Sequence, residues 1–253
     1  ENALPAGSIE LKLNIETYVN IGYKLFRPAP GASGSAFSGS LKGHQPNESS
    51  PMTESSTVVL PASTDVLVIG YGLVGACMAA LLGRYGVNTL VIDRVSEVLL
   101  LPRAIALDNE ALRILQMVGL DEEAFERIAI PEVRMHSPLL GQFARANTAG
   151  SIDGHPRLVT FYQPDLERAL RQQVSRSPTV QFCSGLELVD LQQDASGVTA
   201  SLKAADEQMH QVRCNYLVGA DGARSKVRSL IGQEFQGQSY AEDWLIVDAA
   251  QRE

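Results

Sequence analysis

A glycine-rich loop between two apolar runs constrains this chain of 253 residues more than any other feature. The stretch from Asp65 to Arg94 reads DVLVIGYGLVGACMAALLGRYGVNTLVIDR, with an apolar run at each end and a helical pattern between them. This order predicts a strand over 65–70, a helix over 73–85 and a strand over 88–93, which together form a βαβ unit. The unit indicates an α/β fold with a parallel sheet of the Rossmann type.

Each glycine of the G-x-G-x-x-G loop has a physical role in such a unit. Gly70 permits the tight turn, Gly72 lets the backbone approach a pyrophosphate, and Gly75 lets the helix and strand pack closely. Leu73 and Val74 stand at the start of the helix, where free N–H groups and the positive end of the helix dipole favour a diphosphate. These five residues are therefore candidates for binding a dinucleotide.

An acid at the end of the second apolar run supports the same interpretation. Asp93 is placed to accept hydrogen bonds from a ribose diol, and its charge disfavours the 2′-phosphate of NADP. Arg94 is able to read such a phosphate, to rest near the adenine or to stay in solvent. On this loop alone FAD and NAD both remain open, and a glycine turn of some other α/β fold is the remaining alternative.

A second motif lies far downstream of the first. Residues 216–228 read YLVGADGARSKVR, an apolar strand followed by a glycine-and-acid turn and a helix that opens near Ser225. Asp221 and Gly222 at this strand-to-helix turn predict a second edge that faces the nucleotide. The alternative is that Asp221 is an ordinary helix cap or turn residue.

With the GxGxxG loop and this GADG-x-x-S-x-x-R signature, the chain resembles the FAD-dependent aromatic-ring hydroxylases, which are single-component flavoprotein monooxygenases. The resemblance covers roughly residue 64 to the end. It implies that Asp221 lies where the ribityl–pyrophosphate part of FAD and the incoming nicotinamide cofactor come close. Arg224 and Arg228 match the signature helix, and we expect them to hold the loop by pairing.

Two inner segments are similar to hydroxylases of the 3-(3-hydroxyphenyl)propionate and pentachlorophenol type. In PRAIALD the resemblance assigns Arg103 to the FAD pyrophosphate, although Ala106 stands where those relatives commonly have glycine. In QPDLERAL it places Gln163 against the flavin sugar chain, and it expects a backbone group near Leu188 to meet the adenine. Arg103 as a surface arginine and Gln163 as an ordinary helix-start residue beside Pro164 remain alternatives.

The chemistry that the resemblance implies is hydroxylation of a phenolic or other small aromatic substrate. NADH or NADPH reduces the FAD, O2 adds at the flavin C4a carbon, and the hydroperoxide transfers oxygen. The alternatives are another flavoprotein of the same fold (a halogenase, an epoxidase or a reductase), an NAD-dependent dehydrogenase, and an inactive FAD-binding fragment. No residue can be identified as a catalytic acid or base from the sequence. The catalytic residues therefore stay unknown, as do the substrate and the oligomeric state.

The family's third motif, a Gly-Asp-Ala-Ala-His-like turn, is not found before Glu253, so we expect a fragment cut at both ends. The first sixty residues read differently from the rest, with a strand pattern over 9–15, a stretch rich in Ser, Gly and Pro, and Met52 opening what looks like an ordinary start. We therefore expect residues 1–51 to lie outside the functional enzyme. The fold predicted for the whole is a Rossmann-like FAD-binding domain (GR2-type) with a β-rich insertion that forms part of a substrate domain. Its expected parts are a disordered or non-native extension (1–57), the FAD-binding domain (58–130 and 163–240), substrate-domain strands (131–162) and the start of a truncated substrate domain (241–253).

The remaining elements are predicted from periodicity and breakers. A helix over 108–118 has Ala111, Leu112, Leu115 and Val118 on one stripe and Gly119 as its stop. The other expectations are a short acidic helix (121–128), two or three strands broken by Pro138, Gly150 and Pro156, a helix (165–176), and strands at 179–183, 186–193, 197–203 and 210–218 with a hairpin turn at 194–197.

Composition excludes several classes of function. With 21 basic and 29 acidic residues the chain is acidic, which disfavours nucleic acid as a partner. No apolar run approaches the roughly 20 residues of a membrane span. Three scattered cysteines and four isolated histidines show no metal-ligand spacing, so we expect no metal, and the cysteine usage favours a reducing, cytoplasmic location.

Overall fold

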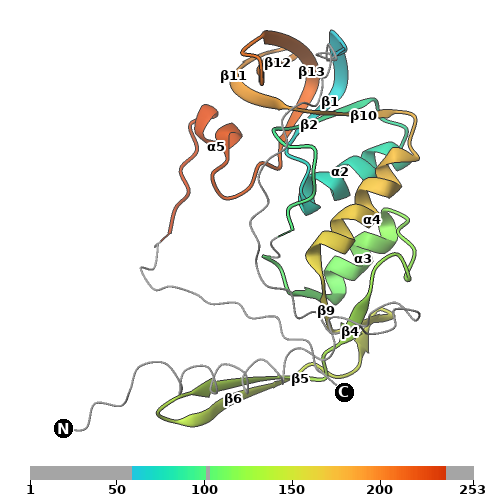
Figure 1. The fold of residues 1–253 in the computed structure, drawn as a ribbon, viewed down its shortest axis with the longest axis vertical. Coiled ribbons are helices and arrows are strands. Elements are labelled where there is room, and N and C mark those ends of the chain that lie inside the picture. The colour runs from blue at the N-terminus through green and yellow to red at the C-terminus, as the bar shows by residue number, and fades with distance from the viewer. Residues whose placement is uncertain (1–58, 101–102, 238–253) are drawn as a thin grey trace, which may run out of the picture.

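The computed structural model describes residues 59–100 and 103–237 and centres on a six-stranded sheet (Figure 1). Three neighbouring pairs in this sheet are parallel, and the two pairs beyond β13 are antiparallel. The strands in spatial order are β10 (Val180–Ser184), β2 (Thr89–Asp93), β1 (Ser63–Ile69), β13 (Met209–Gly219), β12 (Gly197–Ala204) and β11 (Leu186–Asp194). An α/β fold is therefore confirmed, with a parallel part of the sheet formed by β10, β2, β1 and β13.

The central strands carry apolar side chains on both faces because the sheet is covered on both faces. Along β1, Val66 and Val68 pack toward the helices, whereas Leu67 and Ile69 pack toward β11, β12 and a short C-terminal helix, α5 (Lys226–Leu230). Successive side chains of a strand point to opposite faces, so one continuous apolar run supplies two cores. The β11–β13 meander curls back until β11 contacts β2.

In the described part of the chain the helices that accompany the sheet are α2 (Leu73–Arg84), α3 (Asn109–Met117), α4 (Gln163–Ser175) and α5 (Lys226–Leu230). In Figure 1, α2, α4 and α3 lie in a row on one side of the strands. The close approach of α2 to the end of α4 requires Gly83, because a Cβ there would lie 2.4 Å from the Ser177 hydroxyl. The predicted ends of α3 are confirmed, since Asp108 accepts from the Ala111 N–H at 2.8 Å and Gly119 ends the helix with φ of +77°.

The segment between α3 and α4 consists of short strands. A small sheet has the order β3 (Ala106–Asp108), β9 (Leu158–Phe161), β4 (Arg127–Ala129). The hairpin of β5 (Glu132–Ser137) and β6 (Gly141–Asn147) extends away from the helices in Figure 1. Two strands of two residues, β7 (Ser151–Ile152) and β8 (His155–Pro156), follow the hairpin, so this region holds more strands than expected and Pro156 lies within one.

The predicted acidic helix over 121–128 is wrong. Residues 122–125 form turns, and Arg127–Ala129 is strand β4, paired with β9. Phe125 is buried and meets the Phe161 ring edge-on at 6.1 Å between centroids. Strand pairing and this aromatic contact therefore outweigh the helix propensity of the Asp, Glu and Ala residues.

Within the described residues, no helix has the length and apolar character to cross a bilayer. The expectations for residues 1–57 and 241–253, including the strand pattern at 9–15, lie outside the described residues. The division into domains stays a prediction.

Candidate functional site

The G-x-G-x-x-G loop packs directly on the downstream GADG turn. Gly70 has φ of +100°, and a Cβ on it would lie 2.4 Å from the carbonyl oxygen of Ala220. A Cβ on Gly75 would lie 2.0 Å from the carbonyl oxygen of Gly70. Both positions therefore exclude any larger residue, and the contact joins two motifs about 150 residues apart in the sequence.

Gly72 differs from its two neighbours, because open space surrounds it. Its backbone is extended, with φ of −74°, and a Cβ there would meet no atom within 4 Å. Gly72 precedes the first residue of α2, Leu73, and no side chain caps this helix end or adds an acid to its first turn. The N–H groups of the helix start and its positive dipole end are thus available to an anion, as predicted for this loop.

Asp93, at the end of β2, ties the glycine loop to the segment that follows it. Its Oδ2 accepts from the Tyr71 N–H at 2.7 Å, and its Oδ1 accepts from the Val95 N–H at 3.1 Å. A carboxylate has about four acceptor positions, so these two bonds leave capacity for a ribose diol.

Asp221 holds the start of α5. Its Oδ1 accepts from the Ser225 hydroxyl at 2.6 Å, and its Oδ2 accepts from the N–H groups of Lys226 and Val227 at 2.6 and 3.1 Å. The contacts of this carboxylate are thus those of the helix-cap alternative, although Asp221 also lines the groove described next. Gly222 follows in the left-handed region with φ of +79°.

The carboxyl ends of the strands enclose a groove of about 460 Å³. It includes the Gly72 loop, the Asp221 turn and the start of β11, so the two motifs share one site. Ligands of open α/β sheets bind at this edge. The lining residues are Ile69, Gly70, Gly72, Ile92, Asp93, Arg94, Leu186, Glu187, Leu188, Ala220, Asp221, Gly222, Arg224 and Lys226.

Leu188 can offer only its backbone to this groove, because its side chain is buried in the core. It lies on β11, the edge strand of the sheet, just before an irregularity in the pairing with β12. Edge strands carry backbone N–H and C=O groups that no neighbouring strand uses. The backbone contact of this strand to adenine stays a prediction.

The two arginines of the signature helix have different environments. Arg228 donates to the carbonyl oxygen of Ala223 at 2.9 Å and so holds the loop as expected. Arg224 was expected to pair in the same way, but it makes no hydrogen bond or ion pair with any described residue and instead lines the groove. Together with Arg94 and Lys226 it gives the groove three cations.

Arg103 and Gln163 are not among the lining residues of this groove. The Gln163 Oε1 accepts from the N–H groups of Arg103 and Ala104 at 2.7 and 2.9 Å. The glutamine therefore positions the Arg103 segment, and the Arg103 guanidinium has no described partner.

Sequence reasoning missed Arg171, which the structure places behind the glycine loop. Its guanidinium donates to the Tyr71 carbonyl oxygen at 3.0 Å and to Glu167 at 2.8 Å. Tyr71 is buried, and this burial raises the pKa of its hydroxyl to about 12. The only sequence signal was the i, i+4 spacing of Glu167 and Arg171 on a predicted helix.

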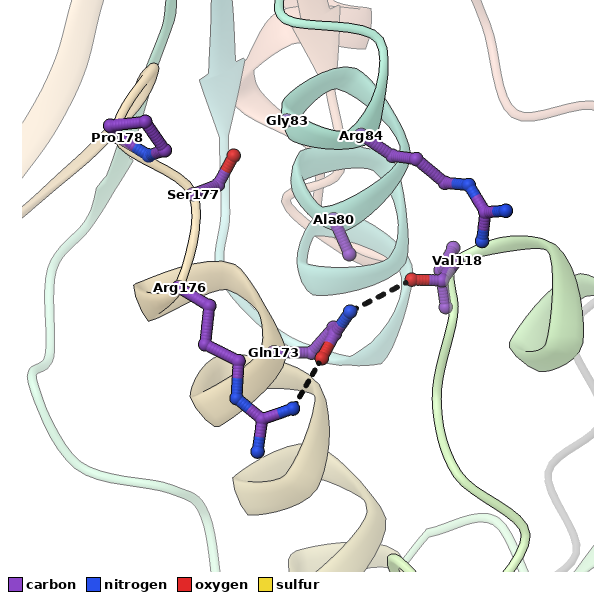
Figure 2. Close-up of a pocket in the computed structure, with 8 residues that line it drawn as sticks. All are labelled: Ala80, Gly83, Arg84, Val118, Gln173, Arg176, Ser177 and Pro178. Carbon is purple, nitrogen blue, oxygen red and sulfur yellow. Dashed lines mark hydrogen bonds between the residues drawn. The ribbon is translucent and has the colours of Figure 1, made fainter.

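A second depression, of about 360 Å³, lies at the C-terminal ends of α2 and α4 (Figure 2). Figure 2 shows the Gln173 amide donating to the Val118 carbonyl oxygen, at 3.3 Å, while it accepts from Arg176. Arg84 donates to the Met117 carbonyl oxygen at 3.0 Å. These side chains satisfy the terminal carbonyls of α3, so the polar groups of this depression have a structural role.

The groove at the strand ends has the features that an adenine dinucleotide requires. Open space over Gly72 and a free helix start suit a pyrophosphate, Asp93 suits a ribose, and the β11 edge suits a base. The residues present therefore fit the group that the sequence predicted.

Comparisons with known proteins agree with this geometry. A family model described as FAD binding domain matches residues 63–253, so the chain belongs to the FAD binding domain family. It is 39% identical over 186 residues to a 3-(3-hydroxy-phenyl)propionate/3-hydroxycinnamic acid hydroxylase of Burkholderia cenocepacia, covering 73% of this chain and 34% of that protein. A hydroxylase of the same description from Escherichia coli K12 is 34% identical over 189 residues, covering 74% and 34%. The chain thus spans about a third of the length of these curated relatives.

Solved structures give the same result. The p-nitrophenol 4-monooxygenase PnpA of Pseudomonas putida aligns with a TM-score of 0.64 and 25% identity, over 71% of this chain and 46% of that one. The flavin-dependent monooxygenase PieE, solved in complex with FAD and substrate, aligns with a TM-score of 0.56 and 28% identity, over 67% and 32%.

Proposed function

We propose that the groove at the strand ends holds the adenosine diphosphate part of FAD. The observation that carries this proposal is that the Gly72 loop, Asp93 and the Asp221 turn line one groove, with open space where a Cβ on Gly72 would stand. Membership of the FAD binding domain family supports FAD over NAD as the dinucleotide.

The proposed contacts follow from the groups that face the groove. The N–H groups of Gly72, Leu73 and Val74 bind the pyrophosphate, and Gly70 and Gly75 shape the turn that presents them. Asp93 accepts from the adenosine ribose, and the backbone at Leu188 meets the adenine, with Arg94 beside it. Arg103, presented by Gln163, reaches the pyrophosphate from the side of α4, while Asp221 and Gly222 form the opposite wall.

We further propose that the chain is the FAD-binding portion of a cytoplasmic monooxygenase that hydroxylates a small aromatic, phenolic substrate with NADH or NADPH and O2. The names of the relatives support this activity. Bound FAD supplies the redox chemistry, accepting a hydride from the nicotinamide and activating O2. The residues of this chain bind and orient it, and Asp221 keeps the wall of the groove in place through α5.

A cofactor titration of the 253-residue chain tests the proposal. Quenching of flavin fluorescence should report one FAD per chain. FMN, which lacks the adenosine half, and NAD should bind at least about tenfold more weakly, a difference of about 1.4 kcal/mol in binding free energy. Binding of NAD in preference to FAD would instead support the dehydrogenase alternative. The activity itself is tested as oxidation of NADH or NADPH that depends on 3-(3-hydroxyphenyl)propionate and consumes O2.

A further inference from the structure

The inner face of α4 carries an ion pair that reaches both loops of the proposed FAD site. Glu167 and Arg171 are 2.8 Å apart, with side chains that are 4% and 15% exposed. Arg171 also donates to the carbonyl oxygen of Ser96 at 2.6 Å and to that of Tyr71 at 3.0 Å. Ser96 follows Asp93 by three residues, and Tyr71 lies between Gly70 and Gly72. One guanidinium therefore connects the loop after β1 to the loop after β2.

The ring of Tyr71 fixes the guanidinium further. Arg171 lies over the Tyr71 ring at 4.7 Å from its centroid, and the Phe182 ring is 4.3 Å from that of Tyr71. The Nε of Arg171 is buried without a hydrogen-bond partner in the described part of the chain. A buried donor without a partner is unfavourable, so the contacts of the two terminal nitrogens and the ring must outweigh that loss.

Peptide geometry links this contact to the groove. In a planar trans peptide the C=O and N–H groups point in opposite directions. Because the Tyr71 carbonyl faces Arg171, the N–H of Gly72 points away from it, and Gly72 lines the groove. Tyr71 is fixed a second time, since its own N–H donates to Asp93.

We propose that Arg171, held by Glu167, is a positioning residue for cofactor binding: it sets the plane of the Tyr71–Gly72 peptide and joins that loop to the segment after Asp93. The inference rests on the proposed function, since the ligand whose phosphates meet Gly72 is FAD. Arg171 does not line the groove and acts through the backbone of the two loops.

The test uses the 253-residue chain with Arg171→Met, which removes the donors and keeps a long apolar side chain. The matched control is Arg168→Met, because Arg168 lies on the same helix, is half exposed and forms its ion pair, among the described residues, with the half-exposed Asp165. Arg171→Lys keeps the charge but not the fork of donors, so its effect should be intermediate. It also serves as the second variant in case Arg171→Met fails to fold.

Two measurements separate positioning from a general structural role. FAD affinity, measured by fluorescence titration, should fall about tenfold or more in Arg171→Met and stay within about twofold in Arg168→Met. Hydrogen–deuterium exchange without FAD should accelerate in peptides that cover 70–76 and 94–98 of the arginine variant, while β10 and β12 keep their protection. The exchange measurement needs no cofactor, so it can fail independently of the proposed function.

Three results would overturn the inference. If both Arg171→Met and Arg171→Lys keep the FAD affinity and the loop exchange rates of the wild type, the arginine positions nothing. Faster exchange throughout the sheet, or an equal loss of affinity in Arg168→Met, would show a non-specific effect on folding. If the wild-type chain binds no FAD, but loop exchange is faster in Arg171→Met than in the wild type, the proposed function is contradicted. Arg171 would then be only a structural link between the two loops.

Discussion

The three glycines of the six-residue loop, Gly70, Gly72 and Gly75, have different roles. The contacts that an added Cβ would make at each position distinguish these roles. A Cβ on Gly70 or Gly75 would collide with backbone atoms, at 2.4 and 2.0 Å. A Cβ on Gly72 would stand in open space. Gly70 and Gly75 are therefore needed for folding, whereas Gly72 is needed only if a ligand occupies the space above it.

This difference predicts opposite effects of substitution. Gly72→Asn and Gly72→Asp should fold with wild-type stability, because both residues cap a helix start well. Both should weaken FAD binding by about tenfold or more, and the aspartate more strongly because it repels the phosphates. Gly75→Ala should lose roughly 1–3 kcal/mol of unfolding free energy from overpacking.

Urea unfolding and FAD titration of the three variants supply the measurement. If Gly72→Asp and Gly72→Asn bound FAD as tightly as the wild type, the pyrophosphate could not lie over Gly72. If Gly75→Ala unfolded at the wild-type urea concentration, α2 would not pack closely against the carbonyl group of Gly70.

At the scale of elements, the β11–β12 hairpin shows how one charged group can define a turn. Asp194 accepts from the N–H and the hydroxyl of Ser196 at 2.7 and 2.8 Å, and from Arg213 of β13 at 2.6 Å. The hydrogen bonds from Arg213 and Ser196 hold the pKa of the Asp194 carboxyl well below its usual range. A local turn is thus attached to the third strand of the meander.

This lowered pKa predicts an acid dependence of stability. A carboxyl whose pKa is lower in the folded state stabilises the fold above its unfolded pKa, near 3.9, and loses that contribution as the pH falls toward the folded value. The difference in urea midpoint between the wild type and Asp194→Asn should therefore be constant from pH 7 to about pH 5 and should shrink below about pH 4. A difference that stayed constant down to pH 2 would show that the Asp194 charge does not contribute.

At the scale of the whole molecule, the groove exists because the sheet curls. The meander brings β11 over to β2, and the turn after β13 meets the glycine loop after β1. Segments from the two ends of the described chain therefore form one site. A ligand in that groove bridges the βαβ unit and the meander, so its binding energy should oppose global unfolding.

The corresponding prediction concerns thermal stability. A ligand that binds only the folded state adds about 2.7 kcal/mol at a concentration 100 times its Kd. FAD should raise the melting temperature in proportion to the logarithm of its concentration, and ADP should do so more weakly, while FMN should have no effect below its own Kd. Equal stabilisation by FMN and FAD, measured by calorimetry, would show that the adenosine half of FAD does not bind in this groove.

The sequence determined those parts of the protein in which neighbouring residues decide the outcome. The βαβ unit, the stop at Gly119, the turn at 194–197 and the strands of the meander follow from period, glycine and turn chemistry, which act over a few residues. The common groove of the Gly72 loop and the Asp221 turn also followed, because parallel strands expose their carboxyl ends at one edge.

The partner that each polar group meets, and the places where packing outweighs propensity, depend on the tertiary structure. The Gln163 amide meets a backbone 60 residues away, Arg171 meets a loop 100 residues away, and the region of the predicted acidic helix contributes strand β4 instead. The carboxylate of Asp221 was open to two interpretations until its donors on α5 were in place. Such contacts depend on the positions of segments far apart in the chain, and no local pattern of residues encodes those positions.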